Sequence, residues 1–106
     1  MKVSELTSFD QMEHERYESD PAYAAEADRL ALADAVSVAV LVYRTDHGLT
    51  QTAFGRRLGM KQPQVARLER GDTPPSVETL QRLASAGVLE VTIAASGTTV
   101  RELATA

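Results

Sequence analysis

Two short segments separated by a three-residue turn constrain the fold of this chain more than any other feature. Residues 51–58 and 62–70 each carry apolar residues on one helical face, and Gly59-Met60-Lys61 lies between them. These apolar residues are Phe54 and Leu58 in the first segment, and Val65 and Leu68 in the second. The pattern predicts two short helices that pack against each other across a tight turn.

Residues that start and stop helices flank both segments. Thr50 suits an N-cap, Pro63 is tolerated in a first helical turn, and Gly71 suits a helix end. Gly55 lies inside the first segment, where it costs on the order of 1 kcal/mol relative to Ala. We therefore expect the second helix to approach it closely. With Gly59 in the turn, these features predict a helix-turn-helix.

A longer helix is predicted upstream. Asp20 can accept amide hydrogens at a helix start, and Pro21 suits the first helical position. Farther along, apolar residues at spacings of three and four predict one buried stripe. They are Leu32, Val36, Ala39, Val40 and Tyr43. Val36 to Val42 also alternate as in a half-buried strand, but the surrounding Ala and Leu residues favour a helix. Residues 1–19 suit either a short helix or an unfolded segment.

The pattern changes downstream of Gly71. Asp72-Thr73-Pro74-Pro75 predicts a loop, and Ser76 suits the cap of a further helix that ends at Gly87. Its inward residues are expected to be Val77, Leu80, Leu83 and Ala84. Leu89, Val91 and Ile93 then alternate with polar residues, which predicts a strand, and Ser96-Gly97 permits a turn into a second strand. The expected fold is mainly α: a five-helix domain with a helix-turn-helix and a short C-terminal β-strand or hairpin.

Charge is distributed unevenly along the 106 residues, although the whole chain carries only −4. Residues 1–33 hold eight acidic and three basic residues, whereas residues 34–75 hold six basic and four acidic ones. Such asymmetry indicates two different partners. We therefore divide the chain into an acidic, partner-binding segment (1–33), a DNA-binding helix-turn-helix domain (34–87) and a C-terminal strand or hairpin with a tail (88–106).

Several function classes are disfavoured by composition. The chain has no Cys, and its two His residues, His14 and His47, are far apart, so we expect no metal site and no cofactor. The longest apolar run, residues 35–43, is much shorter than the roughly 20 residues of a membrane helix. No export signal is evident, so a cytoplasmic location is expected. Without a recognisable nucleophile, base and orienting group, the chain is not expected to be an enzyme.

The outward face of the second short helix carries residues that can read bases. With Val65 and Leu68 directed inward, Arg67 and Arg70 point outward, with Gln64 at the edge and Gln62 at the exposed N-terminus. Gln can bind the N6 and N7 atoms of adenine, and Arg can bind the O6 and N7 atoms of guanine. Glu69 points nearer the core, where a structural ion pair with Arg44 is expected.

Residues 48–87 resemble the helix-turn-helix family of phage repressors (Cro and XRE). The resemblance rests on Leu49-Thr50-Gln51, Gly59-Met60-Lys61-Gln62, Val65, Arg67-Leu68-Glu69-Arg70-Gly71 and Pro75-Ser76-Val77-Glu78-Thr79-Leu80. With the upstream helix and the downstream strand, residues 20–95 resemble antitoxins of the HigA type. The resemblance implies a toxin partner of the RelE/HigB class, a ribonuclease, and repression of the protein's own operon.

The same resemblance implies roles for individual residues. Gln51 would touch a phosphate and brace Gln62, and Gln62, Gln64 and Arg67 would face the major groove. Lys61 and Arg70 would hold phosphates, although Lys61 replaces the usual Ser cap and Pro63 occupies a potential base-reading position. These two departures prevent any inference of the operator sequence from relatives.

Two further interactions are expected. Residues 89, 91 and 93 (Leu89, Val91 and Ile93) are candidates for dimerisation through the open edge of their strand, with a helix as the alternative interface. The acidic segment combines its charge with apolar residues that could contact a basic toxin, namely Phe9, Met12, Tyr17 and Tyr23. A stand-alone XRE-type regulator without a toxin, and an adaptor that has lost DNA binding, are the alternatives, and the basic residues between Arg56 and Arg70 argue against the adaptor.

Overall fold

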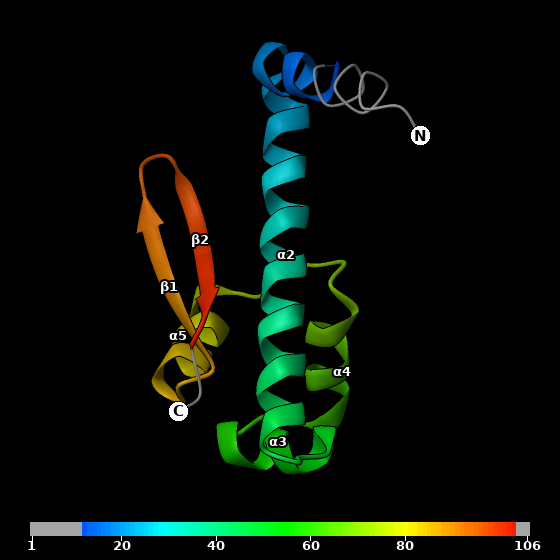
Figure 1. Ribbon diagram of the computed structural model, residues 1–106, viewed down its shortest axis with the longest axis vertical. Coiled ribbons are helices and arrows are strands. Elements are labelled where there is room, and N and C mark those ends of the chain that lie inside the picture. Colours follow the sequence, from blue (N-terminus) through cyan, green and yellow to red (C-terminus); the bar gives the residue numbers. More distant parts are fainter. Residues whose placement is uncertain (1–11, 104–106) are drawn as a thin grey trace.

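The computed structural model describes residues 12–103, which form helices and one β-hairpin (Figure 1). Residues 12–19 are helical, and the elements that follow are α2 (Pro21–Asp46), α3 (Gln51–Leu58), α4 (Gln62–Arg70), α5 (Val77–Ser85), β1 (Leu89–Ala94) and β2 (Gly97–Glu102). The expected fold class, mainly helical with a C-terminal hairpin, is confirmed.

Helix α2 is the long axis of the molecule. The Asp20 side chain accepts hydrogen bonds from the amides of Ala22 and Tyr23 at 3.1 and 3.2 Å, which confirms the predicted helix start. The helix then continues for 26 residues without a break, so the strand alternative for residues 36–42 is wrong. The change from acidic to basic sequence at residue 33 therefore falls inside one continuous helix. No helix among residues 12–103 has the length and apolarity needed to cross a membrane.

The helical residues 12–19 are attached to the N-terminal end of α2 by two polar contacts. The Tyr17 hydroxyl donates a hydrogen bond to the Asp28 carboxylate at 2.9 Å, and the Arg16 guanidinium lies 4.4 Å from the centre of the Tyr23 ring. The hydrogen bond to Asp28, and the negative charge of that carboxylate, raise the pKa of Tyr17 above its ordinary value. Residues 12–19 thus form a helix that packs against the N-terminal end of α2.

Helices α3 and α4 meet across the predicted turn. Gly59 adopts a left-handed conformation (φ 71°) that terminates α3, as its place in the turn predicts. At Gly55, an added Cβ would collide with the Met60 carbonyl oxygen and would meet the Val65 side chain at 3.4 Å. Helix α4 approaches Gly55 closely, as expected, but the backbone of the turn at Met60 lies even closer to Gly55.

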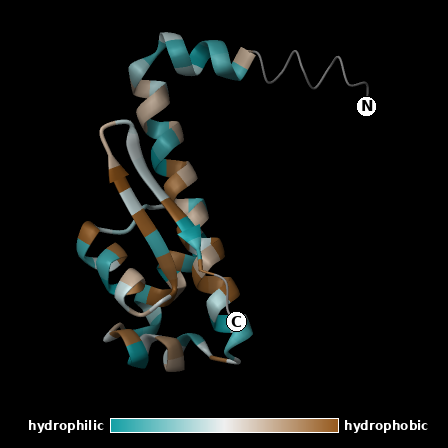
Figure 2. Ribbon diagram, turned by 60° about the vertical axis from the view of Figure 1, so that its left-hand side comes forward, coloured by the Kyte–Doolittle hydropathy of each residue, from teal (hydrophilic) through white to brown (hydrophobic). Residues whose placement is uncertain are grey.

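The core lies where α2, α3, α4, α5 and β1 converge, and hydrophobic residues recur along these elements (Figure 2). Its largest fully buried side chains are Phe54, Leu83, Leu89, Val36, Val40 and Val65. The prediction that Val77 belongs to the core is wrong, because this residue is 65% exposed. It is the first residue of α5, directly after the Ser76 cap, and this end of the helix extends beyond the core.

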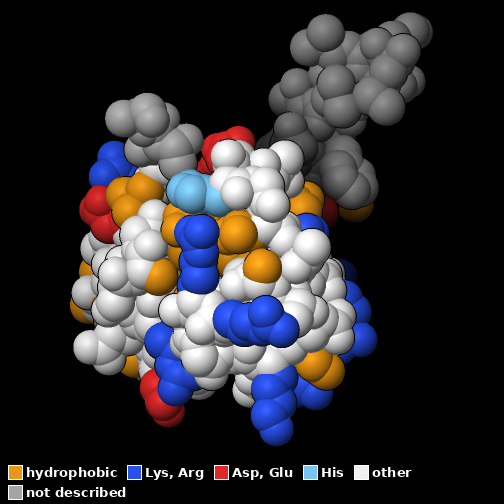
Figure 3. Space-filling model, turned by 90° about the horizontal axis from the view of Figure 1, so that it is seen from below, with side chains coloured by type: hydrophobic (Ala, Val, Ile, Leu, Met, Phe, Trp, Pro, Cys, Tyr) orange, Lys and Arg blue, Asp and Glu red, His pale blue; other side chains and the backbone are white. Residues whose placement is uncertain are grey.

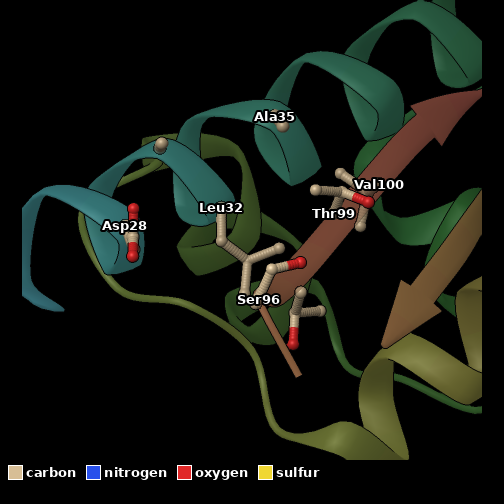
Figure 4. A pocket seen from close by; sticks show the side chains of 9 residues that line it. Asp28, Leu32, Ala35, Ser96, Thr99 and Val100 are labelled. Atoms are coloured by element: carbon tan, nitrogen blue, oxygen red, sulfur yellow. The ribbon is translucent and has the colours of Figure 1, made fainter. Parts of the chain in front are cut away.

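The hairpin packs between α2 and α5. Strand β1 pairs with β2 in an antiparallel register that places Val91 opposite Val100, and β2 lies nearer α2 while β1 contacts α5. Towards its tip the hairpin leaves an open pocket against α2, lined by Asp28, Leu32, Ala35, Ser96, Thr99 and Val100 among others (Figure 4). Leu89 is only 1% exposed, so β1 begins inside the core and the hairpin is part of the same folded unit.

Candidate nucleic-acid interface

The outward face of α4 carries the side chains expected to read bases. Gln62, Gln64, Arg67 and Arg70 are all exposed, while Val65 and Leu68 are buried against the other helices. Pro63 is also exposed and occupies the first turn of α4. The helix thus presents amide and guanidinium groups to solvent on one side and is anchored by apolar residues on the other.

A chain of hydrogen bonds connects α2 with the first residue of α4. The Arg44 guanidinium of α2 forms a half-buried ion pair with Glu69 of α4, with 2.6 Å between Nε and Oε1. Gln51 of α3 donates to the other oxygen of Glu69 at 2.6 Å. Gln62 in turn donates from its Nε2 to Oε1 of Gln51 at 2.8 Å. The Arg44–Glu69 pair and the bracing of Gln62 by Gln51 are therefore confirmed.

These hydrogen bonds determine which atoms of the Gln62 side chain remain available to bind a ligand. One hydrogen of its Nε2 is used by Gln51, so its Oε1 and the second hydrogen of Nε2 can bind a ligand. Because Gln51 is itself held by Glu69, the Gln62 amide is positioned before any ligand arrives. Such preorganisation reduces the side-chain entropy lost on binding.

Gln64 has a second role that the sequence analysis did not identify. Its Oε1 accepts a hydrogen bond from the Lys61 backbone amide at 2.8 Å, whereas the Lys61 side chain, which has no acceptor atom, makes no cap. Gln64 therefore supplies one half of a capping box, the bond to the N-cap amide, while the other half, a bond from the Gln64 amide to a Ser side chain at the N-cap, has no equivalent with Lys61. A two-atom contact of Gln64 with adenine would need the second lone pair of the same oxygen. The signal was present in the sequence, since Gln three residues after an N-cap is typical of a capping box.

Basic side chains predominate around α3 and α4. Viewed from the end of the molecule that carries α3, Lys and Arg side chains outnumber acidic ones (Figure 3). The exposed basic residues of these two helices and their connecting turn are Arg56, Arg57, Lys61, Arg67 and Arg70. The acidic residue of this region, Glu69, is turned inward and is half-buried in its pair with Arg44. The surface is suited to a polyanion.

Arg82 of α5 is a further residue of this region that the sequence analysis missed. Its Nη1 donates to the Gly59 carbonyl at 3.1 Å, and its Nη2 bonds Glu78 at 3.3 Å. The first bond satisfies a backbone carbonyl of the turn between α3 and α4. The i, i+4 spacing of Glu78 and Arg82 was visible in the sequence, but the contact with residue 59 depends on the tertiary fold.

The remaining candidate residues lie away from α4. Residues 12–23 lie at the opposite end of α2 from α3 (Figure 1). Among them, Met12 and Tyr17 are exposed and Tyr23 is half-buried. Phe9 lies outside the described residues. Of the dimerisation candidates, Leu89 is buried in its own core, Val91 is half-buried and Ile93 is 65% exposed. Only Val91 and Ile93 therefore present apolar surface to a second molecule.

Comparison with protein families identifies one match. Residues 42–87 match the family model described as helix-turn-helix, which includes α3, α4, α5 and the last turn of α2. The matched residues are fewer than half of the 106 in the chain. No curated protein and no solved structure matches. Residues 42–87 therefore form a helix-turn-helix domain, an architecture that places its second helix in the major groove of DNA.

We predict that Glu69→Gln lowers the free energy of unfolding by about 1–3 kcal/mol, because it leaves the half-buried Arg44 guanidinium without its counter-charge. Urea denaturation measures the change. Glu90→Gln is the matched control, because Glu90 also pairs with an Arg at 2.6 Å, in an exposed position on the hairpin. That substitution should cost less than about 1 kcal/mol. Equal losses from both substitutions would contradict a special role for Glu69.

Proposed function

We propose that this protein is a sequence-specific DNA-binding transcriptional regulator that inserts α4 into the major groove. One observation carries the proposal: the exposed face of α4 presents Gln62 and Arg67, and Gln62 is held in place through Gln51 and Glu69. Arg67 is the best candidate for a two-atom contact with guanine. The helix-turn-helix match over residues 42–87 supports this reading.

The other polar residues of this surface have distinct proposed tasks. Lys61 and Arg70 contact phosphates on either side of the groove, and Gln51 contacts a phosphate near the start of α3. Arg70 lies 4.0 Å from Asp72, an exposed pair that salt screens readily and that contributes little to stability. Gln64 contacts bases with its amide nitrogen while its oxygen retains the cap. Phosphate contacts set the position and affinity, whereas base contacts set the sequence preference.

The functional unit is proposed to be a homodimer. A single α4 reads few base pairs, and two-fold dimers match inverted half-sites about 34 Å apart. In the part of the chain that the structure describes, β1 pairs with β2 alone, which leaves the outer edge of β1 open. Val77, Val91 and Ile93 line an apolar groove between α5 and β1 beside that edge. These side chains, rather than the buried Leu89, are the proposed contacts with the second copy.

A second candidate function is neutralisation of a RelE/HigB-like toxin, combined with repression of the protein's own operon. The observation that favours it is the net charge of −5 on residues 1–33, next to the exposed Met12 and Tyr17. A ribonuclease must hold RNA phosphates on a cationic surface, which an acidic segment can cover. The stand-alone regulator differs from this candidate only in lacking such a partner.

Substitution of Arg67 and of Arg70 should have different effects on DNA binding. Arg67→Ala should cost roughly 1–3 kcal/mol and relax the preference at one base position. Arg70→Ala should weaken binding to all sequences similarly and reduce the salt slope by about one. Fluorescence anisotropy over a salt series, on duplexes selected from a random library, measures both. Arg101→Ala, at an exposed position of β2, is the control. Unchanged affinity of Arg67→Ala for the selected site would refute the assignment of α4.

Dimerisation through the edge of β1 should be abolished by Ile93→Lys, because the new charge would be buried against the second copy. Sedimentation should then show monomers at micromolar concentration, and affinity for the palindromic site should fall. Thr92→Lys is the control, since Thr92 is exposed and its side chain points to the other face of the same strand. If Ile93→Lys remains dimeric, the interface lies elsewhere, for example on a helix.

If the protein is an antitoxin, toxin neutralisation and DNA binding should be separable by mutation, because they are proposed to use opposite ends of α2. A chain lacking residues 1–19 keeps the Asp20 cap and should still bind DNA, but it should fail to protect cells from the RelE-like toxin encoded beside it. Arg67→Ala should show the reverse behaviour. Growth on co-expression of the toxin, together with operator binding by the purified chain, provides the two readouts. Full protection by the shortened chain, or the absence of a toxin gene nearby, would refute this candidate function.

A further inference from the structure

One face of α2 carries apolar side chains on which no other element among residues 12–103 packs. Figure 1 shows the hairpin on one side of α2 and α4 on the other, with the connection between α4 and α5 passing behind α2. On this face four aliphatic residues are 37–48% exposed: Leu30, Val38, Leu41 and Val42. Single exposed aliphatic residues are ordinary, but four on one face of one helix form a patch. We call these four residues the outer stripe.

The spacing of the outer stripe is that of a helix-packing surface. Leu30, Asp34, Val38 and Leu41 follow one another at intervals of four, four and three residues, so they lie along one face of α2. From Leu30 to Val42 the stripe extends roughly 18 Å along the helix axis. This is the length of about three helical turns, which a short amphipathic helix can cover.

The charges of this surface are acidic. Residues 30–43 contain no Lys or Arg, and exposed Asp34 lies in the middle of the stripe. Asp28 does not belong to this surface, because it lies on the side of α2 that faces the hairpin pocket and accepts a hydrogen bond from Tyr17. The nearest basic residues are engaged elsewhere: Arg29 bonds Glu26 at 3.4 Å, and Arg44 is held by Glu69. The stripe therefore combines apolar area with an unbalanced negative charge.

We infer that the outer stripe is the docking surface for an amphipathic helix of a partner protein, with apolar residues on one face and Lys or Arg beside them. Apolar contacts supply the affinity, and the basic residues neutralise Asp34. A second copy of this chain fits less well. Pairing two stripes, parallel or antiparallel, would bury two Asp34 carboxylates without a basic residue from either stripe. The inference is independent of DNA binding, because no residue of α4 takes part in it.

The test uses the full-length chain and a synthetic helical peptide of about 14 residues, with Leu at every third or fourth position and Lys on the flanks. Nuclear magnetic resonance of the labelled protein should show shifts concentrated in residues 30–42. Asp34→Lys and Leu41→Ser should each weaken binding about tenfold. Glu102→Lys is the matched control for Asp34→Lys, because it makes the same charge change at an exposed position of β2 that lies outside the outer stripe, the DNA-facing helices and the proposed dimer contacts. It should bind the peptide as the unmodified chain does.

Three outcomes would overturn the inference. The first is peptide binding that leaves residues 30–42 unperturbed, or no binding at all. The second is equal affinity for a peptide in which Glu replaces every Lys, which would show that Asp34 contributes nothing. The third is a dimer in sedimentation that Leu41→Ser converts to monomers, because the occupant of the stripe would then be a second copy. Thermal denaturation of each variant confirms that exposed positions were changed without unfolding the chain.

Discussion

The ion pair between Arg44 and Glu69 connects the stability of this protein with its proposed function. It joins the end of α2 to the end of α4, and Glu69 also accepts a hydrogen bond from Gln51 of α3. Arg44 in addition donates to the Leu49 carbonyl at 3.1 Å, in the connection between α2 and α3. Because both charged groups are partly removed from water, each needs these partners to offset its lost hydration. The same contacts place the Gln62 amide at the start of α4.

The length of α2 explains how an acidic chain can carry a basic, DNA-facing surface. The acidic residues Glu13, Glu15 and Glu18 precede the N-terminal end of this 26-residue helix, and the basic residues of α3 follow its C-terminal end (Figure 1). Helix α4 runs back from that end, and Gly71 at its end lies against Ala33 and Ser37 in the middle of α2. A helix of that length spans about 39 Å. At physiological ionic strength charges are screened within about 8 Å. The two ends therefore act as separate electrostatic surfaces, and the net charge of −4 describes neither of them.

Much of the fold could be predicted because its signals are local. Asp20, Thr50 and Ser76 cap the helices they were expected to cap, and Gly59 and Gly71 adopt the left-handed conformation that ends a helix. Each of these signals depends on one residue and its immediate neighbours. Val77 is a residue for which the local sequence pattern gave the wrong prediction. Its apolar side chain fits the helical pattern of α5, yet it is exposed because the core does not extend to that end of the helix.

The sequence by itself determined the helix boundaries, the turn between α3 and α4, and which face of α4 meets solvent, because capping and periodicity act over a few residues. Only the tertiary structure decided which polar atoms remain available on that face. Gln62 is held by Gln51, a residue of another helix, which leaves the Gln62 Oε1 and one hydrogen of its Nε2 for a ligand. The bond between Gln64 and the Lys61 amide, by contrast, is a local capping contact that the spacing of these two residues already indicated. The tertiary structure also decided that Leu89 is buried in the core of its own chain and that Leu30, Val38, Leu41 and Val42 of α2 remain partly exposed among the described residues. These features depend on how separate helices and strands pack together. The spacing of residues along one helix does not indicate which other element will pack against it.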